Sequence, residues 1–150
     1  MSHGPPPDLG ARPEREYPPA RSLAGLGRRY VALFVDTMLV SFGASFVTSF
    51  LGPESGNERL VFLFSIAIVL SVTDGVVLVA LRGQTVGKML LSVQVVRAHT
   101  YAIPGWGPAI IRYLVQAVPL LNIVDPLWAI WDPRKQAIHD KAAKTLVVDA

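Results

Sequence analysis

Two long apolar runs constrain the fold of this chain more than any other feature. Residues 30–51 and residues 60–81 are each 22 residues long, and each contains one charged side chain, Asp36 in the first and Asp74 in the second. A helix of that length extends about 33 Å, and the hydrocarbon core of a bilayer is about 30 Å thick. Between the runs, GPESGNER (residues 52–59) contains glycines and a proline that end a helix and turn the chain. The runs therefore predict a transmembrane helical hairpin.

The composition also indicates a membrane protein. Hydrophobic residues make up 51% of the chain and charged residues 17%, and the mean hydropathy is +0.42, which is too apolar for an ordinary soluble domain. The net charge is +3, but the basic residues flank the apolar runs, so we attribute them to membrane topology and expect no nucleic-acid partner. The chain has no cysteine, which excludes disulfides, thiolate nucleophiles and cysteine metal sites.

Residues 1–27 differ in composition from the rest of the chain. They contain half of the 12 prolines and almost no apolar periodicity, so they cannot bury enough surface to offset chain entropy. We predict a disordered, proline-rich tail, with a proline-rich docking segment as the alternative. A cleaved signal peptide is not expected, because the first apolar run begins only at Tyr30. The predicted membrane domain is then residues 28–150.

Positively charged residues predict the orientation of the hairpin. The loop 52–59 carries only one, Arg59. The basic residues near the other end of the hairpin are Arg21, Arg28, Arg29, Arg82, Lys88 and Arg97. Because Lys and Arg are enriched on the cytoplasmic side of membranes, the N-terminus and the segment after residue 82 are expected in the cytoplasm and the loop outside.

A third apolar region covers residues 106–131. Trp106 stands at one end and Trp128 and Trp131 at the other, as interfacial anchors do. The region is interrupted by Arg112, Gln116, Pro119, Asn122, Asp125 and Pro126. A single tilted span would leave the basic C-terminal tail outside, against the charge bias, whereas a broken or re-entrant helix would return that tail to the cytoplasm. We favour the re-entrant form.

The segment between these regions, residues 83–105, begins with GQTVGK. This is not a phosphate-binding loop, because only three residues separate its glycines and Met89 follows the lysine. From Met89 to Val96, apolar positions alternate in a pattern typical of a strand, and TLVV (residues 145–148) is a second β-prone piece that can pair with it. We therefore predict a small amphipathic or strand-containing cap on the cytoplasmic side.

Helix geometry relates the charged residues of the two runs. Asp36 lies seven residues after Arg29, nearly two helical turns, so both are expected on one helix face about 10 Å apart. In the antiparallel hairpin, Asp74 reaches about the same depth as Asp36. Arg112 and Gln116, at positions i and i+4 of the third region, can point into the same layer. Intramembrane ionisable residues usually face the bundle interior and pair there.

Two interpretations of this layer remain open. A structural clasp, in which Arg29 pairs with Asp36 and fixes helix packing together with Asp74, needs no substrate. Alternatively, Asp36 and Asp74 alternate between protonated and ionised forms during ion transport. The sequence does not decide between the two.

Two further acidic residues have simpler interpretations. Asp125 precedes Pro126, which indicates a helix break near the membrane interface. The pair His139–Asp140 is typical of metal phosphohydrolases, but such sites need several further His and Asp ligands and the chain has only three histidines. We expect no metal site.

Three segments of the sequence resemble one family. RRYVALFVD, GQTVGKMLLSVQVV and DPRKQAIHDKAAKTLVV, in this order, resemble the signature blocks of the RDD family of small bacterial membrane proteins, named for one arginine and two aspartates. The resemblance covers about residues 24–148. It implies an integral membrane protein for which transport has been proposed, and it supplies no substrate.

The resemblance also implies which residues form the family signature. The arginine corresponds to Arg29 or its neighbour Arg28, the aspartate inside the first helix to Asp36, and the second aspartate to Asp140. The family often has proline where Val86 stands here, a departure that affects a turn. If the C-terminal tail is cytoplasmic, Asp140 can meet Arg28 or Arg29 at the membrane surface.

Together these observations predict an all-α, multi-pass protein of the bacterial inner membrane with a cytoplasmic N-terminus. We expect no enzyme activity and no cofactor. The first functional hypothesis is transport or ion handling, and the alternative is a non-catalytic accessory or scaffold subunit of a larger membrane complex. Since two or three spans enclose little space, transport would require a homo-oligomer in the bilayer.

Overall fold

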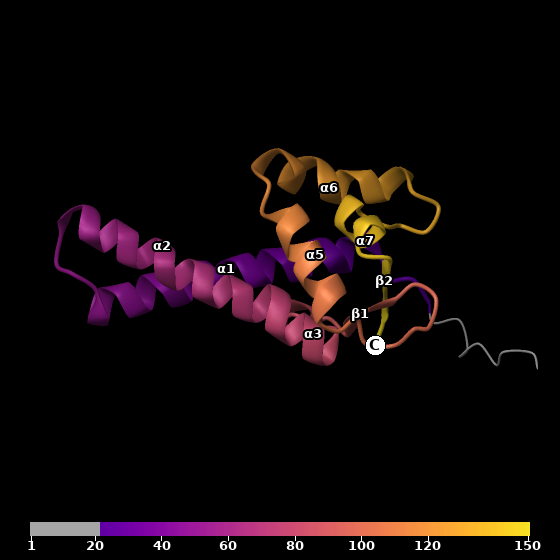
Figure 1. Cartoon of the computed structure of the whole chain (residues 1–150), viewed down its shortest axis with the longest axis horizontal. Coiled ribbons are helices and arrows are strands. Elements are labelled where there is room, and N and C mark those ends of the chain that lie inside the picture. The colour runs from indigo at the N-terminus through magenta and orange to yellow at the C-terminus, as the bar shows by residue number, and fades with distance from the viewer. Residues whose placement is uncertain (1–21) are drawn as a thin grey trace, which may run out of the picture.

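A long helical hairpin dominates the structure (Figure 1). The computed structural model describes residues 22–150, without the side chains of residues 119–123 and 126, and most of the predicted tail, residues 1–21, lies outside the described residues. The first arm of the hairpin is α1 (Leu26–Leu51). The second arm runs without interruption through α2 (Gly56–Val72), the π-helix η1 (Thr73–Leu78) and α3 (Val79–Arg82).

Both arms are long and apolar enough to cross a membrane. The most apolar window of the first arm is 22% buried, and that of the second arm, Gly56–Arg82, is 6% buried. A core helix of a soluble protein would be mostly buried, whereas these arms leave their apolar faces exposed, as helices that can span a membrane do. Where the arms face each other, α1 buries the small residues Ala44 and Thr48, which allow close helix approach. The arms begin earlier than the predicted spans 30–51 and 60–81.

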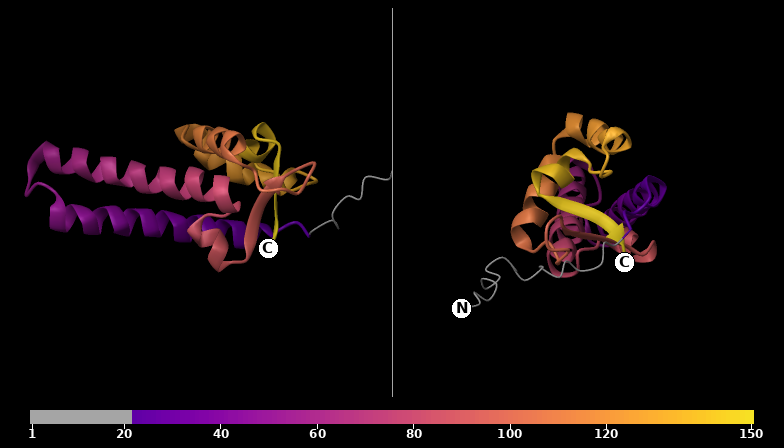
Figure 2. Two further views of the ribbon diagram at one scale, coloured as in Figure 1. Left: turned by 60° about the horizontal axis from the view of Figure 1, so that its bottom comes forward. Right: turned by 90° about the vertical axis from the view of Figure 1, so that its right-hand side faces the viewer.

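The end of the hairpin near Arg82 carries a small folded unit, here called the cap, made of residues 83–105 and 132–150 (Figure 2). Its sheet pairs β1 (Val93–Arg97) with β2 (Thr145–Asp149) in antiparallel register, with Val95 opposite Val147. The predicted pairing with residues 145–148 is therefore observed.

The strand predicted from Met89 begins later than expected. Residues before it form the short helix α4 (Val86–Leu90), and its N-cap residue Thr85 accepts a hydrogen bond from the backbone nitrogen of Lys88. Ser92, with a φ of 51°, then turns the chain into β1. Alternation of apolar residues predicted one strand because it does not detect this helix cap.

The third apolar region forms two short helices, α5 (Trp106–Gln116) and α6 (Pro119–Trp131). They have 11 and 13 residues, whereas a transmembrane helix needs about 20. The break lies at residues 117–118, and α6 runs through Asp125, so the helix break predicted at Asp125 is wrong. A proline stands at the start of α6, and because proline has no backbone N–H it favours the start of a new helix over continuation of the preceding one.

The chain on both sides of α5 and α6 is bonded to the same sheet. Before α5, Arg97 Nε donates to the carbonyl of Pro104 at 2.9 Å. After α6, Gln136 Nε2 donates to the carbonyl of Thr145 at 2.8 Å, shortly before α7 (Ile138–Ala142). The segment before α1 reaches the sheet as well, through a bridge between Leu23 and Val148.

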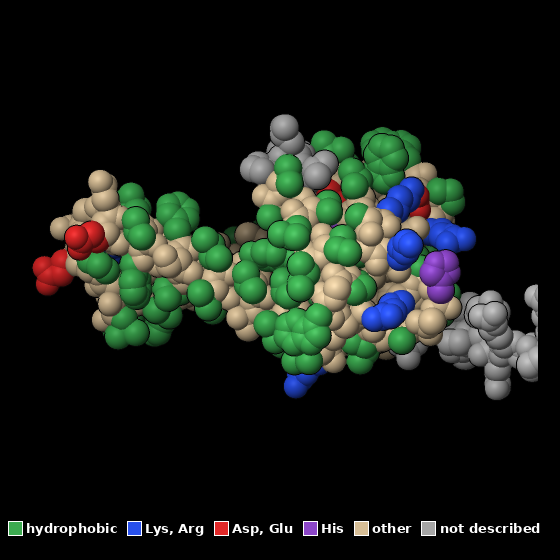
Figure 3. Space-filling view, viewed as in Figure 1, with side chains coloured by type: hydrophobic (Ala, Val, Ile, Leu, Met, Phe, Trp, Pro, Cys, Tyr) green, Lys and Arg blue, Asp and Glu red, His purple; other side chains and the backbone are tan. Residues whose placement is uncertain are grey.

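The buried core lies where the cap, α5 and the adjoining end of the hairpin meet. It contains Val76, Val79, Val93, Val95, Ala109 and Val147. Figure 3 shows hydrophobic side chains along the hairpin, acidic side chains at its far end and most basic side chains on the cap. This core fixes the positions of the polar residues described next.

Candidate functional site

Asp36 is held by the GQTVGK segment. Its carboxylate, 8% exposed, accepts hydrogen bonds from Thr85 Oγ1 at 2.6 Å and from the backbone nitrogen of Gly87 at 2.5 Å. This approach requires glycine, because a Cβ at position 87 would lie 2.3 Å from the carbonyl oxygen of Ala32. The segment that resembles a phosphate loop therefore binds a carboxylate of the protein itself.

Asp74 binds the same segment from the second arm. Its Oδ1 accepts a hydrogen bond from the backbone nitrogen of Val86 at 2.9 Å. Because Val86 and Gly87 are consecutive, the carboxylates of Asp74 and Asp36 lie beside each other at the start of α4, where backbone N–H groups lack helical partners. Asp74 lies in η1, and π-helical turns inside α-helices frequently occur at functional sites.

A cavity of about 510 Å³ opens next to these two carboxylates. We call it the acid cavity. Its walls come from α1, the second arm, α4 and α5, and Tyr113 on α5 lies 3.3 Å from Ser71 on α2 between their hydroxyl oxygens. The polar residues that line it are Asp36, Thr37, Ser41, Ser71, Asp74, Thr85, Lys88, Tyr113 and Gln116. Carboxylates and hydroxyls are the groups that coordinate hard cations.

Asp140 is the centre of a second cluster, in the cap. It is 1% exposed and forms an ion pair with Arg112 Nη1, while Arg29 Nη1 lies 3.7 Å from its other oxygen. Arg112 also donates to Thr145 Oγ1 at 2.8 Å. Burial alone would raise the pKa of Asp140, but Arg112, His139 and Arg29 together lower it to about 2.

Arg29 connects the first helix to the C-terminal part of the chain. In addition to Asp140, its guanidinium donates to the carbonyl of Lys135 and, at 2.9 Å, to that of Val147. The predicted pairing of Arg29 with Asp36 is therefore wrong. Arg29 points toward the cap, and Asp36 is already bonded by α4, so the two residues belong to different clusters.

His139 lies between two carboxylates. Its backbone nitrogen donates to Asp125 Oδ1 at 2.7 Å, its Nδ1 contacts Asp125 Oδ2, and its Nε2 lies 3.4 Å from Asp140. Gln116 Nε2 approaches the same imidazole at 3.4 Å. Asp125, interpreted from sequence as a residue at a helix break, instead joins α6 to α7.

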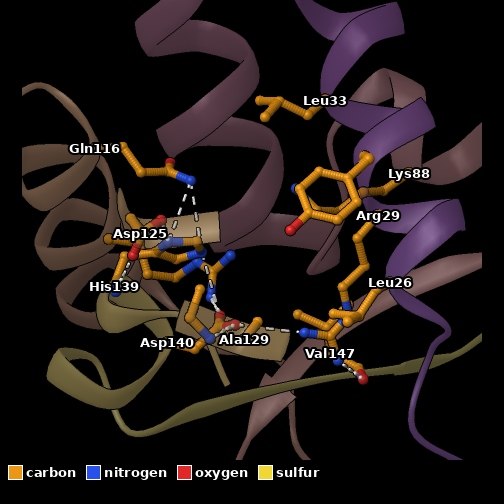
Figure 4. A pocket seen from close by; sticks show the side chains of 13 residues that line it. Leu26, Arg29, Leu33, Lys88, Gln116, Asp125, Ala129, His139, Asp140 and Val147 are labelled. Carbon is orange, nitrogen blue, oxygen red and sulfur yellow. Dashed lines mark hydrogen bonds and ion pairs between the residues drawn. The ribbon is translucent and has the colours of Figure 1, made fainter. Parts of the chain in front are cut away.

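The cluster around Asp140 lines a smaller cavity of about 70 Å³, the cap cavity (Figure 4). In this view Arg29 reaches from α1 toward Asp140, and Gln116 lies above His139 and Asp125. Lys88, Gln116 and Leu33 line both the cap cavity and the acid cavity, so the two cavities are neighbours.

The predicted site residues thus fall into two clusters and a surface pair. Asp36, Asp74 and Gln116 line the acid cavity, and Arg29, Arg112, Gln116, Asp125 and Asp140 line the cap cavity. Arg28 instead forms an exposed ion pair with Asp149. Within residues 22–150 no group of three or more His, Asp or Glu side chains is arranged to hold a metal ion.

Sequence reasoning missed Thr85, Lys88 and His139. Threonine is a preferred residue immediately before a helix, where its hydroxyl accepts a backbone N–H, so Thr85 in GQTVGK was a readable candidate for a helix cap. Lys88 was assigned to topology alone, and His139 was considered only as a metal ligand. No local pattern in the sequence indicates that their partners lie on other helices.

One of three comparisons with known proteins identifies a family for this chain. Neither a search of curated proteins nor a search of solved structures gives a match. A family model for the RDD family matches residues 23–144, which include both arms of the hairpin, α4, and the Arg29–Asp140 contact. The chain belongs to the RDD family.

Proposed function

We propose that this protein is a multi-pass protein of the bacterial inner membrane that binds monovalent cations at a site formed by Asp36 and Asp74 in exchange for protons. The observation that carries the proposal is the acid cavity, in which both carboxylates face a space lined by hydroxyl groups. Asp36 lies ten residues after the start of α1, which is about 15 Å along a helix and therefore within a bilayer. Carboxylates at that depth commonly mark ion or proton pathways.

The proposed topology has the cap in the cytoplasm and residues 52–59 outside. The basic side chains on the cap and the acidic ones at the far end of the hairpin support it (Figure 3). Residues 106–131 would then enter the membrane as α5 and return as α6, because both helices are short and their ends are bonded to the same sheet. In this arrangement α5 forms a wall of the acid cavity from within the protein, as broken helices in membranes do.

A second candidate function is that of an accessory or scaffold subunit. It is favoured by the hydrogen bonds of Asp36 and Asp74 to α4, because a purely structural contact between the arms and the cap would be satisfied in the same way. The largely apolar outer faces of both arms fit either lipid or neighbouring membrane helices.

The decisive experiment measures ion-driven proton movement in proteoliposomes. Wild-type protein is expected to move protons on addition of sodium, potassium or lithium; Asp36→Asn abolishes the signal and Asp74→Asn weakens it. Glu54→Gln is the matched control. It also removes one negative charge, but Glu54 is exposed at the far end of the hairpin, away from the acid cavity. Folded wild-type protein that moves no protons with any of these cations between pH 5 and pH 9 would refute exchange and leave the accessory role.

The oligomeric state provides an independent test. The protein is purified in mild detergent and its mass is determined by light scattering. A defined homo-oligomer supports exchange, since one copy encloses little space. Stable co-purification with other membrane proteins supports the accessory role.

A further inference from the structure

The ammonium of Lys88 forms no ion pair in the described part of the chain. It lies next to the carboxylates of Asp36 and Asp74, which form none either. Among residues 22–150, Asp125, Asp132, Asp140 and Asp149 each form an ion pair, whereas Asp36 and Asp74 form none. Lys88 lines both the acid cavity and the cap cavity. Within the part of the chain that the structure describes, its ammonium donates one long hydrogen bond, 3.5 Å, to Thr85 Oγ1.

Thr85 connects this lysine to the acid cavity. Its hydroxyl donates to Asp36 Oδ2 at 2.6 Å and is the atom that Lys88 Nζ approaches. One hydroxyl group therefore separates the ammonium from the carboxylate. A lysine side chain is flexible and carries a compact charge, and Lys88 already lines the acid cavity, so Nζ can approach Asp36 by rotation of the side chain alone.

We propose that the Lys88 ammonium is a tethered occupant of the acid cavity, which a free monovalent cation replaces when Lys88 loses its proton. This inference rests on the proposed function, because it requires a cation site at Asp36 and Asp74. It assigns to Lys88 the control of when that site is available.

The electrostatic surroundings of Lys88 favour such an exchange. The titratable groups that line the two cavities with it are Arg29, Tyr30 and Asp36 from α1, Asp74 from η1, Arg112 and Tyr113 from α5, Asp125 from α6, and His139 and Asp140 from α7. On the cap side, Asp125 and Asp140 are already paired with His139 and the two arginines. The unpaired negative charge therefore lies on the acid-cavity side.

The protonation equilibrium of Lys88 lies near physiological pH. Burial, reinforced by repulsion from Arg112, lowers the pKa of Lys88 to about 8. Roughly one tenth of the molecules then carry neutral Lys88 at pH 7 and roughly nine tenths at pH 9. If only these molecules accept a cation, the apparent Kd for the cation is about tenfold weaker at pH 7 than at pH 9.

Binding of radioactive sodium to the purified full-length protein tests this inference. Binding is measured by scintillation proximity in detergent at pH 7 and pH 9 for wild type, Lys88→Gln and Lys88→Arg. We expect a tenfold change with pH in wild type, tight binding at both pH values in Lys88→Gln, and weak binding at both in Lys88→Arg, because the guanidinium stays charged. Asp36→Asn gives the background.

The outcomes separate the two proposals. Sodium binding by Lys88→Gln with the full tenfold pH dependence overturns the role of Lys88 and leaves the cation site. Absence of sodium binding in wild type and in Lys88→Gln at both pH values overturns the site itself.

A second measurement needs no variant. Wild-type protein in weak buffer is expected to release nearly one proton per sodium bound at pH 7 and about a tenth of a proton at pH 9. The number of protons released per sodium should therefore fall with a midpoint near pH 8. If it does not, the proposal is contradicted, even if the Lys88 variants do not fold.

Discussion

The contact between α4 and the first helix depends on a missing side chain, which makes Gly87→Ala a sensitive perturbation. The added Cβ would lie 2.3 Å from the carbonyl oxygen of Ala32 and 2.7 Å from Asp36 Oδ1, whereas ordinary contacts begin at 3.4 Å. The α4 backbone must therefore move away from α1 by about 1 Å. This shift stretches the bond between Gly87 N and Asp36, now 2.5 Å, to the limit of a hydrogen bond.

Three contributions determine how much Gly87→Ala lowers the free energy of unfolding. Overpacking costs about 1–3 kcal/mol, and loss of a hydrogen bond to a charged acceptor costs about 1.5–3 kcal/mol. The higher helix propensity of alanine offsets about 1 kcal/mol. We expect the free energy of unfolding to fall by about 2–5 kcal/mol, which corresponds to a decrease in Tm of about 6 °C or more.

Thermal unfolding in detergent, followed by tryptophan fluorescence, measures this effect. Gly27→Ala is the matched control, because it makes the same change in a helix where the added Cβ meets nothing within 4 Å. The control is expected to keep or slightly raise the Tm. If both variants have the same Tm, the close approach of α4 to α1 is not a source of stability, and the reasoning is refuted.

Four further results are expected. Asp140→Asn leaves the buried Arg112 and the partly buried Arg29 without their anion and lowers the free energy of unfolding by about 3–5 kcal/mol in a denaturant titration; a loss below about 1 kcal/mol would show that these ion pairs contribute little. Because the folded pKa of Asp140 is about 2 and the unfolded value about 3.9, its contribution is present above pH 4 and is lost as the pH falls toward 2, a loss that the Asn variant does not share. Arg28→Ala, at an exposed pair, changes stability by less than about 1 kcal/mol. In intact cells, an impermeant thiol reagent labels Glu54→Cys but not Lys144→Cys, and labelling of both would place the cap outside.

The hairpin and the sheet were predictable from sequence, because they depend on the lengths of the apolar runs and on the alternation of apolar residues. Two apolar runs of 22 residues have one stable arrangement in a bilayer, so the hairpin followed directly. The valines of β1 and β2 alternate or cluster as paired strands do, and they pair as expected. Such patterns report which face of an element is buried.

The partners of the charged residues were not predictable in the same way. Periodicity relates Arg29 to Asp36 on the same helix, but the partners of Arg29, Lys135 and Val147, lie 106 and 118 residues further along the chain. Asp36 likewise has a suitable sequence neighbour in Arg29 and binds α4 instead. The choice between such partners depends on tertiary packing, which a single sequence does not encode locally.

The bonds of Arg29 have a consequence for biogenesis. The first helix leaves the ribosome and enters the bilayer long before residues 135, 140 and 147 have been synthesised, so its arginine has no partner during insertion. The hairpin can form early from nearby residues, and the cap can close only when translation is nearly complete. A chain that stops before β2 would keep the sequence of both arms and lose the contacts of β2 with β1, Leu23 and Arg29, which join the two ends of the chain.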